Sequence, residues 1–442
     1  MSSLVTRRSN AMRAPWPYKI QTDEDTGKRQ TRLIDHLATS LKKTVPGSHT
    51  YTLYILSTKL TSAAPLISPK PSANVESTLL SRKLLIFVAE RISEKETLVV
   101  GAEIHEYHDL ANETLTIYVS KVDTTGYRSD SITPTRNLLS AYMSFYSESE
   151  ERSNKNLSPR RRVVRFHVFA RSQPQYLFHL SSKNPTKRVL ECSKLVRWWK
   201  SILQQNFVSA DAQAKNARGW FFIPGVTNER SARMLINDMV SDETEKLENQ
   251  FWKYGYPYFD TQKAIDVIPR FEDDAKSRWL RSAEDSLTVK EFWYLVSHGG
   301  EFAGSQFAGF FWVEVKSNDS RQTLEQGHSE DSIEEIGGLV IDALTYDSAL
   351  RVLLDQNFES EDAAIKSTLF WKRYFTNLHD GTVSTGSTLS VLVDNPMIKR
   401  EIQRQQTNII PINNLQMSIK RKAPSDVKTS IPPPLIKKSK DG

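Results

Sequence analysis

The segment FEDDAKSRW places two carboxylates, Asp273 and Asp274, next to each other. A carboxylate in a dry pocket can accept the proton of an incoming ammonium group. Two carboxylates buried together disfavour simultaneous ionisation, so one of the two pKa values is expected to rise towards neutrality. The plainer interpretation is a helix N-cap, because an aspartate stands directly before the helical pattern AKSRWLR. The residues by themselves favour the cap, and acid/base chemistry is the second hypothesis.

A basic loop separates a strand from a helix in the middle of the chain. Residues 163–170 alternate in a β-rich run, and apolar residues recur at helical spacing from about Glu191. Lys183, Lys187 and Arg188 lie between the two elements. The aromatic residues around them are Phe169, Tyr176, Phe178, Trp198 and Trp199. Lysines beside the free backbone N–H groups of a helix N-terminus predict a site for a phosphorylated ligand.

The turn KVDTTGYRSDSITPTR, residues 121–136, combines a carboxylate, small hydroxyl side chains and a glycine. This composition is typical of a turn that brings the backbone close to a ligand. It is equally typical of an ordinary exit from a hairpin, which is the default interpretation.

Several catalytic and metal-binding motifs are absent from the sequence. There is no GxxxxGK[ST] loop, no GxGxxG after a strand, no HExxH and no GxSxG elbow. His105 and His108 lie close together but lack a credible third ligand. The single cysteine, Cys192, permits no intrachain disulfide and argues against a thiolate zinc site. We therefore expect no metal, and a reducing, intracellular compartment.

The net charge of +7 is concentrated in residues 397–442, which hold ten Lys and Arg against three Asp and Glu. The preceding residues are balanced. This tail is poor in apolar residues and is expected to be disordered when alone. It could be a nuclear import signal, an arm for an acidic chaperone or nucleic acid, or a solubilising tail. No apolar run approaches the length of a membrane span, and the first residues lack the apolar core of a signal peptide.

Three β-type runs, residues 83–92, 97–107 and 113–123, follow one another closely. The short polar turns between them predict an antiparallel meander. Residues 250–270 are too rich in Gly and Pro for a regular element. Further strands are expected at 50–60, 163–170 and 305–316, and helices at 33–45, 136–146, 229–248 and 289–298, with two more beginning near Glu191 and Asp274. The fold class is α+β, with a mostly antiparallel central sheet surrounded by helices.

This pattern predicts one large domain at residues 33–396. Residues 1–32 are expected to form a flexible arm, and residues 147–162 a charged loop within the domain.

Three segments of the chain resemble a known family in their order and rough spacing. They are FARSQPQYLFHLSSKN with the following LVRWWK, YVSKVDTTGY and FEDDAKSRW. The family is that of the fungal histone acetyltransferases known as regulator of Ty transposition, which acetylate newly made histone H3. It shares its fold with the metazoan CREB-binding-protein acetyltransferases. The resemblance covers roughly residues 84–423 and implies acetyl-CoA as the co-substrate.

The resemblance implies roles for residues of all three segments. Asp274 is the implied catalytic acid or base, with Asp273 as its neighbour. Lys276 matches a lysine that is buried and autoacetylated in the family; otherwise it is an exposed lysine of the first helical turn. Tyr176 and Trp199 match walls of the substrate-lysine tunnel. The implied contacts of acetyl-CoA are Val122, Asp123, Thr124, Ile132, Thr133, Pro134, Thr135, Arg136, Phe169, Gln173, Arg188, Val189, Leu190 and Trp198.

The implied function is direct transfer of the acetyl group to a histone lysine in the nucleus, in chromatin assembly, transcription regulation and the DNA damage response. The implied partners are histones H3–H4 and histone chaperones of the anti-silencing and nucleosome-assembly classes. Residues 147–162 are shorter than the family's insertion that contacts the nucleosome-assembly chaperone. The alternatives are a non-catalytic chromatin- or nucleic-acid-binding protein, acting through its basic tail and aromatic groove, and an inactive acetyltransferase fold kept as a scaffold.

Overall fold

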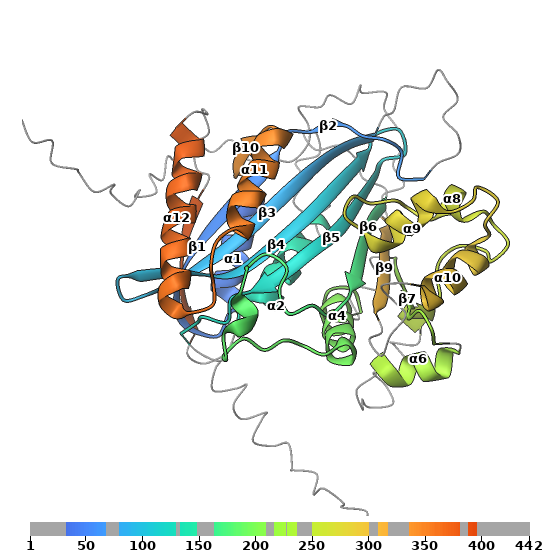
Figure 1. The fold of residues 1–442 in the computed structure, drawn as a ribbon, viewed down its shortest axis with the longest axis horizontal. Coiled ribbons are helices and arrows are strands. Elements are labelled where there is room, and N and C mark those ends of the chain that lie inside the picture. The colour runs from blue at the N-terminus through green and yellow to red at the C-terminus, as the bar shows by residue number, and fades with distance from the viewer. Residues whose placement is uncertain are drawn as a thin grey trace, which may run out of the picture. The chain divides into compact units, whose positions relative to one another are not determined.

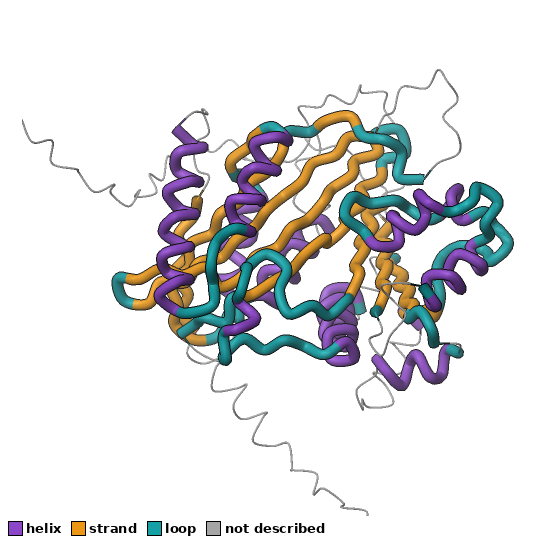
Figure 2. Tube along the Cα trace, in the orientation of Figure 1, coloured by secondary structure: helices purple, strands orange, loops and turns teal. Residues whose placement is uncertain are grey.

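A large sheet runs through the computed structural model of the chain, with helices on both of its faces (Figures 1 and 2). The described residues all lie within one compact unit, Met1–Ile398. The structure describes residues 32–67, 79–129, 133–147, 163–208, 216–226, 228–236, 250–299, 308–316, 336–380 and 388–395. The flexible arm, the charged loop and the basic tail of the sequence analysis fall almost wholly outside these residues, so they stay predictions.

The described part of the sheet contains eleven strands, in the order β10-β1-β3-β4-β5-β6-β9-β7-β8, with β11 on β1 and β2 on β3. The strands are β1 (Gly47–Thr58), β2 (Thr61–Ser62), β3 (Leu79–Ile92), β4 (Lys95–Asp109), β5 (Thr114–Thr124), β6 (Val163–Ala170), β7 (Ala217–Phe222), β8 (Trp252–Tyr254), β9 (Gly309–Lys316), β10 (Leu339–Ile341) and β11 (Thr388–Asn395). The predicted meander is confirmed as the antiparallel strands β3, β4 and β5. Strands β7 and β11 were not predicted.

The sheet is mixed, so the prediction of a mostly antiparallel sheet is wrong. β5 pairs with β6 in parallel, and β1 with β10 and β7 with β8 are parallel pairs as well. A parallel neighbour requires a crossover connection, which helix α2 (Thr135–Ser147) provides between β5 and β6. Side-chain alternation identifies a strand but says nothing about the direction of its partner, and this is why the parallel pairs were missed.

The central strands are buried on both faces. Leu84 and Ile86 of β3 belong to the cluster under one set of helices, whereas Leu85 and Phe87 belong to the cluster under another. This alternation follows from the two-residue period of a strand. The first set is α1 (Leu33–Thr44), α2 and α4 (Cys192–Phe207), and the second is α11 (Ala343–Leu354) and α12 (Glu361–Asp380). Figure 1 shows α11 and α12 in front of the sheet.

A smaller helical layer packs beside β6, β9 and β7. Its members are α8 (Ala264–Val267), α9 (Ala275–Ser282) and α10 (Val289–His298), while α6 (Glu229–Ile236) lies near α4. The predicted long helix at 229–248 is described only to Ile236. The expectation of no regular element at 250–270 is wrong, because β8 and α8 form there. None of the described helices is both long and apolar enough to cross a membrane.

Candidate active site

Asp274 is the N-cap of α9, so the plainer interpretation of this residue describes its geometry correctly. Its Oδ1 accepts a hydrogen bond of 3.3 Å from the backbone N–H of Lys276. Its Oδ2 accepts hydrogen bonds from the Lys276 ammonium at 2.5 Å and from the Ser277 hydroxyl at 2.8 Å. The carboxylate is 1% exposed. A cap buried this deeply, with an ion pair, also has the features of an acid/base group.

Lys276 is buried rather than exposed. Its ammonium also donates to the carbonyl oxygen of Pro269 at 2.7 Å and lies 4.5 Å from the centre of the Phe271 ring. Burial lowers the pKa of Lys276, although Asp274 acts in the opposite direction. The alternative of an exposed first-turn lysine is therefore wrong.

Asp273 does not share the buried environment of Asp274. Its side chain is 54% exposed and forms an ion pair with Lys121 at 2.5 Å. Arg278 lies 3.9 Å from its other oxygen. The two aspartates point to different partners, so the expectation of two carboxylates buried together is wrong, and mutual repulsion cannot be the source of acid/base chemistry here.

Asp274 and Lys276 line a small cavity of about 40 Å³, which we name the aromatic cavity. It lies between the strands β6, β7 and β9 and the helical layer that contains α9 and α10. Its other walls include Tyr118, His167, Phe169, Trp220, Phe222, Tyr256, Tyr258, Phe271, Trp293, Phe310 and Trp312. Burial lowers the pKa of His167 well below its usual value, with a further contribution from the charge of Lys276. The surroundings of Asp274 are therefore apolar and poor in water.

A second cavity of about 280 Å³ adjoins the first, and Phe169 lines both. We name it the basic cavity after Lys121, Arg128, Arg171, Lys187 and Arg188 in its walls. The end of β5, the loop after β6 and the first turns of α4 form these walls. The predicted residues that line it are Val122, Asp123, Thr124, Thr133, Thr135, Phe169, Gln173, Tyr176, Arg188, Val189, Leu190, Trp198 and Trp199. The fold thus brings segments from two distant parts of the sequence into one cavity.

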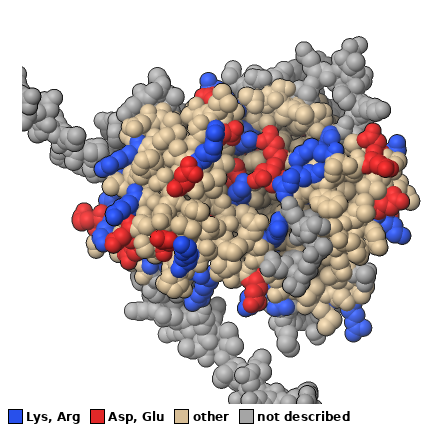
Figure 3. Space-filling model, in the orientation of Figure 1, with Lys and Arg blue, Asp and Glu red and all other residues tan. Residues whose placement is uncertain are grey.

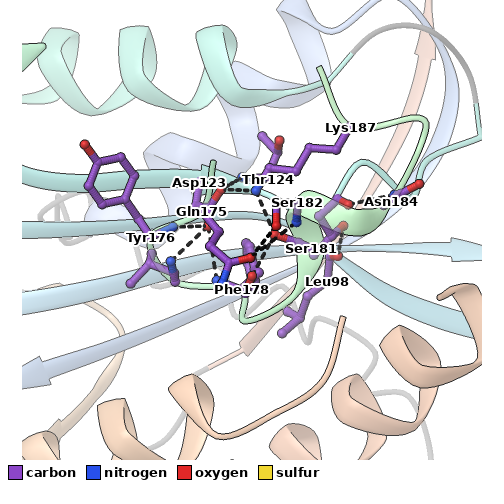
Figure 4. A network of polar contacts seen from close by, with 12 residues as sticks. Leu98, Asp123, Thr124, Gln175, Tyr176, Phe178, Ser181, Ser182, Asn184 and Lys187 are labelled. Carbon is purple, nitrogen blue, oxygen red and sulfur yellow. Dashed lines mark hydrogen bonds and ion pairs between the residues drawn. The ribbon is translucent and has the colours of Figure 1, made fainter. Parts of the chain in front are cut away.

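Asp123 is bonded within the protein, although it borders the basic cavity. Its Oδ2 accepts hydrogen bonds from the backbone N–H groups of Tyr176, Leu177 and Phe178, at 2.7, 2.9 and 3.1 Å. Its Oδ1 accepts one from the Lys187 ammonium at 2.7 Å. Figure 4 shows Asp123 with Tyr176, Phe178 and Lys187 around it. Asp123 therefore shapes the loop after β6, and its side chain has little capacity left for a ligand.

The Lys and Arg side chains of the basic loop after β6 and of the turn before α2 differ in whether they can bind a ligand. Lys183 pairs with Glu359 at 3.0 Å, and Lys187 pairs with Asp123, so neither ammonium is free for a phosphate. Arg188 is exposed and forms no ion pair with a described residue. The Nε of Arg128 is buried without a hydrogen-bond partner among the described residues. Arg128 and Arg188, rather than Lys183 and Lys187, can therefore bind an anion here.

Thr135, the first residue of α2, and Thr133, just before the helix, line the basic cavity. Pro134 and Arg136 do not line it, and Arg136 donates to the Ser201 hydroxyl on α4 at 2.9 Å. Ile132 lies outside the described residues. The N-terminus of α2 nevertheless faces the cavity, where its dipole favours negative charge.

The two tryptophans of α4 border the basic cavity with different burial. Trp199 is 5% exposed and belongs to the core, whereas Trp198 is only partly buried. Their rings meet edge to face, 5.1 Å apart. Both line the basic cavity and neither lines the aromatic cavity, so the tunnel wall implied for Trp199 stays a prediction.

Comparison with known families supplies the identity. The model of the KAT11-type histone acetyltransferase domain matches residues 37–144 and 129–374, well over half of the chain. The chain belongs to the KAT11-type histone acetyltransferase family. The resemblance stated from the three segments is confirmed, and the protein is an enzyme.

This acetyltransferase is similar to fungal enzymes. It is 27% identical over 292 residues to histone acetyltransferase rtt109 of Schizosaccharomyces pombe, covering 63% of this chain and 71% of the relative. It is 25% identical over 387 residues to the rtt109 of Aspergillus flavus, covering 74% and 66%. The crystal structure of Rtt109 from Aspergillus fumigatus superposes with a TM-score of 0.63 at 21% identity, over 81% of this chain and 99% of that one. The last comparison establishes the fold.

Sequence reasoning missed several residues at the site of this KAT11-type acetyltransferase. Lys121, Arg128 and Arg171 line the basic cavity, and Trp220 and Trp312 line the aromatic cavity. The aromatic runs ARGWFF and GFFWVEVK were visible in the sequence. Their closeness to Asp274 was not, because it depends on the pairing of β7 with β9 and of β9 with β6.

Proposed function

We propose that this acetyltransferase transfers the acetyl group of acetyl-CoA directly to a lysine of newly made histone H3. The observation that carries the proposal is the shared wall of Phe169. Phe169 lines both a basic cavity suited to a phosphorylated co-substrate and an aromatic cavity that contains a buried carboxylate. Acetyl transfer requires these two environments side by side.

The residues of the basic cavity fit acetyl-CoA. Arg188 and the unpartnered Nε of Arg128 are suited to its phosphates, together with the N-terminus of α2. Phe169, Trp198 and Leu190 offer apolar surface to the pantetheine arm. The cavity of about 280 Å³ is near the lower end of the size range of small-molecule sites. Acetyl-CoA supplies the activated acetyl group.

The proposed role of Asp274 is to take the proton that the substrate ammonium must lose before it can attack. Among the described residues, its Oδ1 accepts one long hydrogen bond, from a backbone N–H, so this oxygen has capacity for a proton. The Lys276 ammonium and the Ser277 hydroxyl orient the other oxygen. Tyr176 and Trp199 are proposed to guide the substrate lysine, whose neutral form is favoured by their apolar surface. No covalent acyl-enzyme is needed.

We propose histones H3–H4 as the protein substrate, in the nucleus, with histone chaperones of the anti-silencing and nucleosome-assembly classes as partners. On the face drawn in Figure 3, Lys and Arg are interspersed with Asp and Glu. This mixture fits the balanced charge of the residues before the tail. A partner that presents the histone would compensate for the lack of a strongly charged docking face on this side.

The test is acetyl transfer by the purified protein to H3–H4, with and without a chaperone of each class, mapped by mass spectrometry. We expect acetylation at specific H3 lysines, and its loss in Asp274→Asn. Activity that survives in Asp274→Asn would remove Asp274 from the role of base. Acetylation restricted to proteins other than H3 would contradict the proposed substrate.

A further inference from the structure

Lys121 of β5 connects the wall of the basic cavity to the loop that carries Asp274. Its side chain lines that cavity. Its Nζ lies 2.5 Å from Oε2 of Glu103 on β4 and 2.5 Å from Oδ2 of Asp273. One ammonium group thus joins the central sheet to the segment directly before α9.

A bulge in β5 aims Lys121 at this position. In the pairing of β4 with β5, Glu103 lies opposite Lys121 and Ile104 lies opposite Val119, so Ser120 has no partner residue. Successive residues of a regular strand point to opposite faces. Here the Ser120 hydroxyl, at 3.2 Å, and the Lys121 ammonium both donate to Glu103 Oε2. Bulges of this kind re-aim side chains beside active sites.

The pKa values of Glu103 and Lys121 keep both partners of this ion pair charged. Burial alone would raise the pKa of Glu103, but the neighbouring His105 and Lys121 outweigh it, and the pKa falls to about 2. Burial would likewise lower the pKa of Lys121, but Glu103 and Asp273 outweigh it and raise that pKa. Glu103 is 4% exposed and Lys121 is 18% exposed, so solvent screens this pair less than a surface ion pair.

Asp273 has a backbone conformation that requires support. Its φ is +53°, in the left-handed region that residues with a Cβ adopt rarely. Its contact with Lys121 at 2.5 Å is much shorter than its contact with Arg278 at 3.9 Å. Because Asp274 follows directly, the conformation at Asp273 sets the direction in which the Asp274 carboxylate enters the aromatic cavity.

We propose that Lys121 is a positioning residue for acetyl transfer, which holds Asp274 in place relative to the bound co-substrate by fixing Asp273. This inference rests on the proposed role of Asp274. Lys83 offers a matched control, because it pairs at 2.6 Å with Glu272 in the same loop. That pair is more exposed, at 29% and 63%, and Lys83 lines neither cavity.

The experiment compares wild type with Lys121→Met, Lys121→Arg, Asp273→Asn, the double variant Lys121→Met/Asp273→Asn, and Lys83→Met. Three quantities are measured: kcat and KM for acetylation of H3–H4, the Kd for acetyl-CoA by calorimetry, and hydrogen exchange of the peptide covering residues 271–279. Circular dichroism establishes that each variant is folded.

We expect Lys121→Met to lower kcat by about 10- to 100-fold, since a displacement of about 1 Å in an active site has an effect of this size. The Kd for acetyl-CoA should stay close to that of wild type. Exchange of residues 271–279 should become faster, Lys121→Arg should restore part of the activity, and the double variant should be no worse than Lys121→Met. Lys83→Met should resemble wild type.

Two results would overturn the proposal. A weaker Kd for acetyl-CoA with unchanged kcat would make Lys121 a co-substrate contact, and unchanged exchange in a folded Lys121→Met would show that it does not hold the loop. The exchange measurement separates this inference from the proposed function. If wild type does not acetylate H3 but residues 271–279 exchange faster in Lys121→Met, the proposed substrate is wrong while the role of Lys121 in holding this loop is supported. If H3 is acetylated and Lys121→Met changes neither kcat nor exchange, only the positioning role of Lys121 is contradicted.

Discussion

The two cavities share Phe169 but are built in different ways. The basic cavity is about seven times larger than the aromatic cavity, with volumes of about 280 and 40 Å³. Arg188 is exposed, and the Nε of Arg128 has no hydrogen-bond partner among the described residues, so these two arginines are available to a ligand. In the aromatic cavity, the charges of Asp274 and Lys276 are bonded to each other and surrounded by rings.

This difference indicates a division of labour. An open cavity with available cations suits a large anionic co-substrate, whereas a small aromatic cavity suits a group whose protonation must be controlled by the protein. Substitutions of the available arginines of the basic cavity should therefore affect binding, and substitutions in the aromatic cavity should affect turnover and pH dependence. Lys121 differs from these arginines, because its ammonium is bonded to Glu103 and Asp273. The predictions below test the two cavities and the wall between them.

The largest effect is expected at the carboxylate of the aromatic cavity. Asp274→Asn retains a good N-cap residue but removes the proton acceptor, and we expect kcat to fall about 100-fold or more. The Kd for acetyl-CoA should remain unchanged. Asp342→Asn is the matched control, because Asp342 is also an N-cap, accepting from Thr345 N at 2.9 Å, but is exposed at the start of α11. Similar losses in both variants would mean that capping alone matters.

The shared wall should matter for stability and for both functions. Phe169 stacks on Phe310 with ring centres 4.6 Å apart. Phe169→Ala should lower the free energy of unfolding by about 3 kcal/mol and connect the two cavities. Urea unfolding measures the first effect, and combined changes in kcat and in the Kd for acetyl-CoA measure the second. The control is Phe259→Ala, since Phe259 is 77% exposed. Equal stability in the two variants would contradict this packing.

On the other side of the wall, charge reversal at Arg188 should weaken acetyl-CoA binding by about tenfold, the usual order for a charge-assisted contact at an exposed site. Turnover at saturating acetyl-CoA should be nearly unchanged. Lys183→Glu reverses another exposed cation of the same loop, which pairs with Glu359 instead of lining the cavity. Calorimetry with both variants checks the prediction, and equal weakening would point to general electrostatics.

The smallest effect concerns the pH dependence of stability. Burial holds the pKa of His167 well below its usual value, so the folded protein leaves this ring neutral while the unfolded chain protonates it below about pH 6.5. The unfolded state then binds more protons, and stability falls as the pH is lowered, by at most about 1.4 kcal/mol per pH unit from this group. His167→Phe should reduce the slope of unfolding free energy between pH 5 and 6.5, whereas the exposed His298→Phe should keep it. If the unfolding free energies of His167→Phe and wild type had the same pH dependence, the low pKa of folded His167 would be contradicted.

Much of the local structure could be predicted from the sequence. The alternation of residues 83–123 predicted the meander, and the helical spacing after Glu191 predicted α4, because such patterns reflect short-range geometry. The cap before AKSRWLR was predicted for the same reason. The parallel pairing of β5 with β6, and strands β7 and β11, were missed because pairing depends on residues far along the chain.

The sequence by itself determined the chemistry that is available: the carboxylate of Asp274, a basic loop, many aromatic residues and a family resemblance carried by three segments. Only the tertiary structure decided which groups meet. It exposed Asp273 and buried Asp274, bonded Lys187 to Asp123, and brought Lys121 to the loop before α9. The physical reason is that burial and ion pairing depend on distances in space, which the packing of distant strands and helices sets.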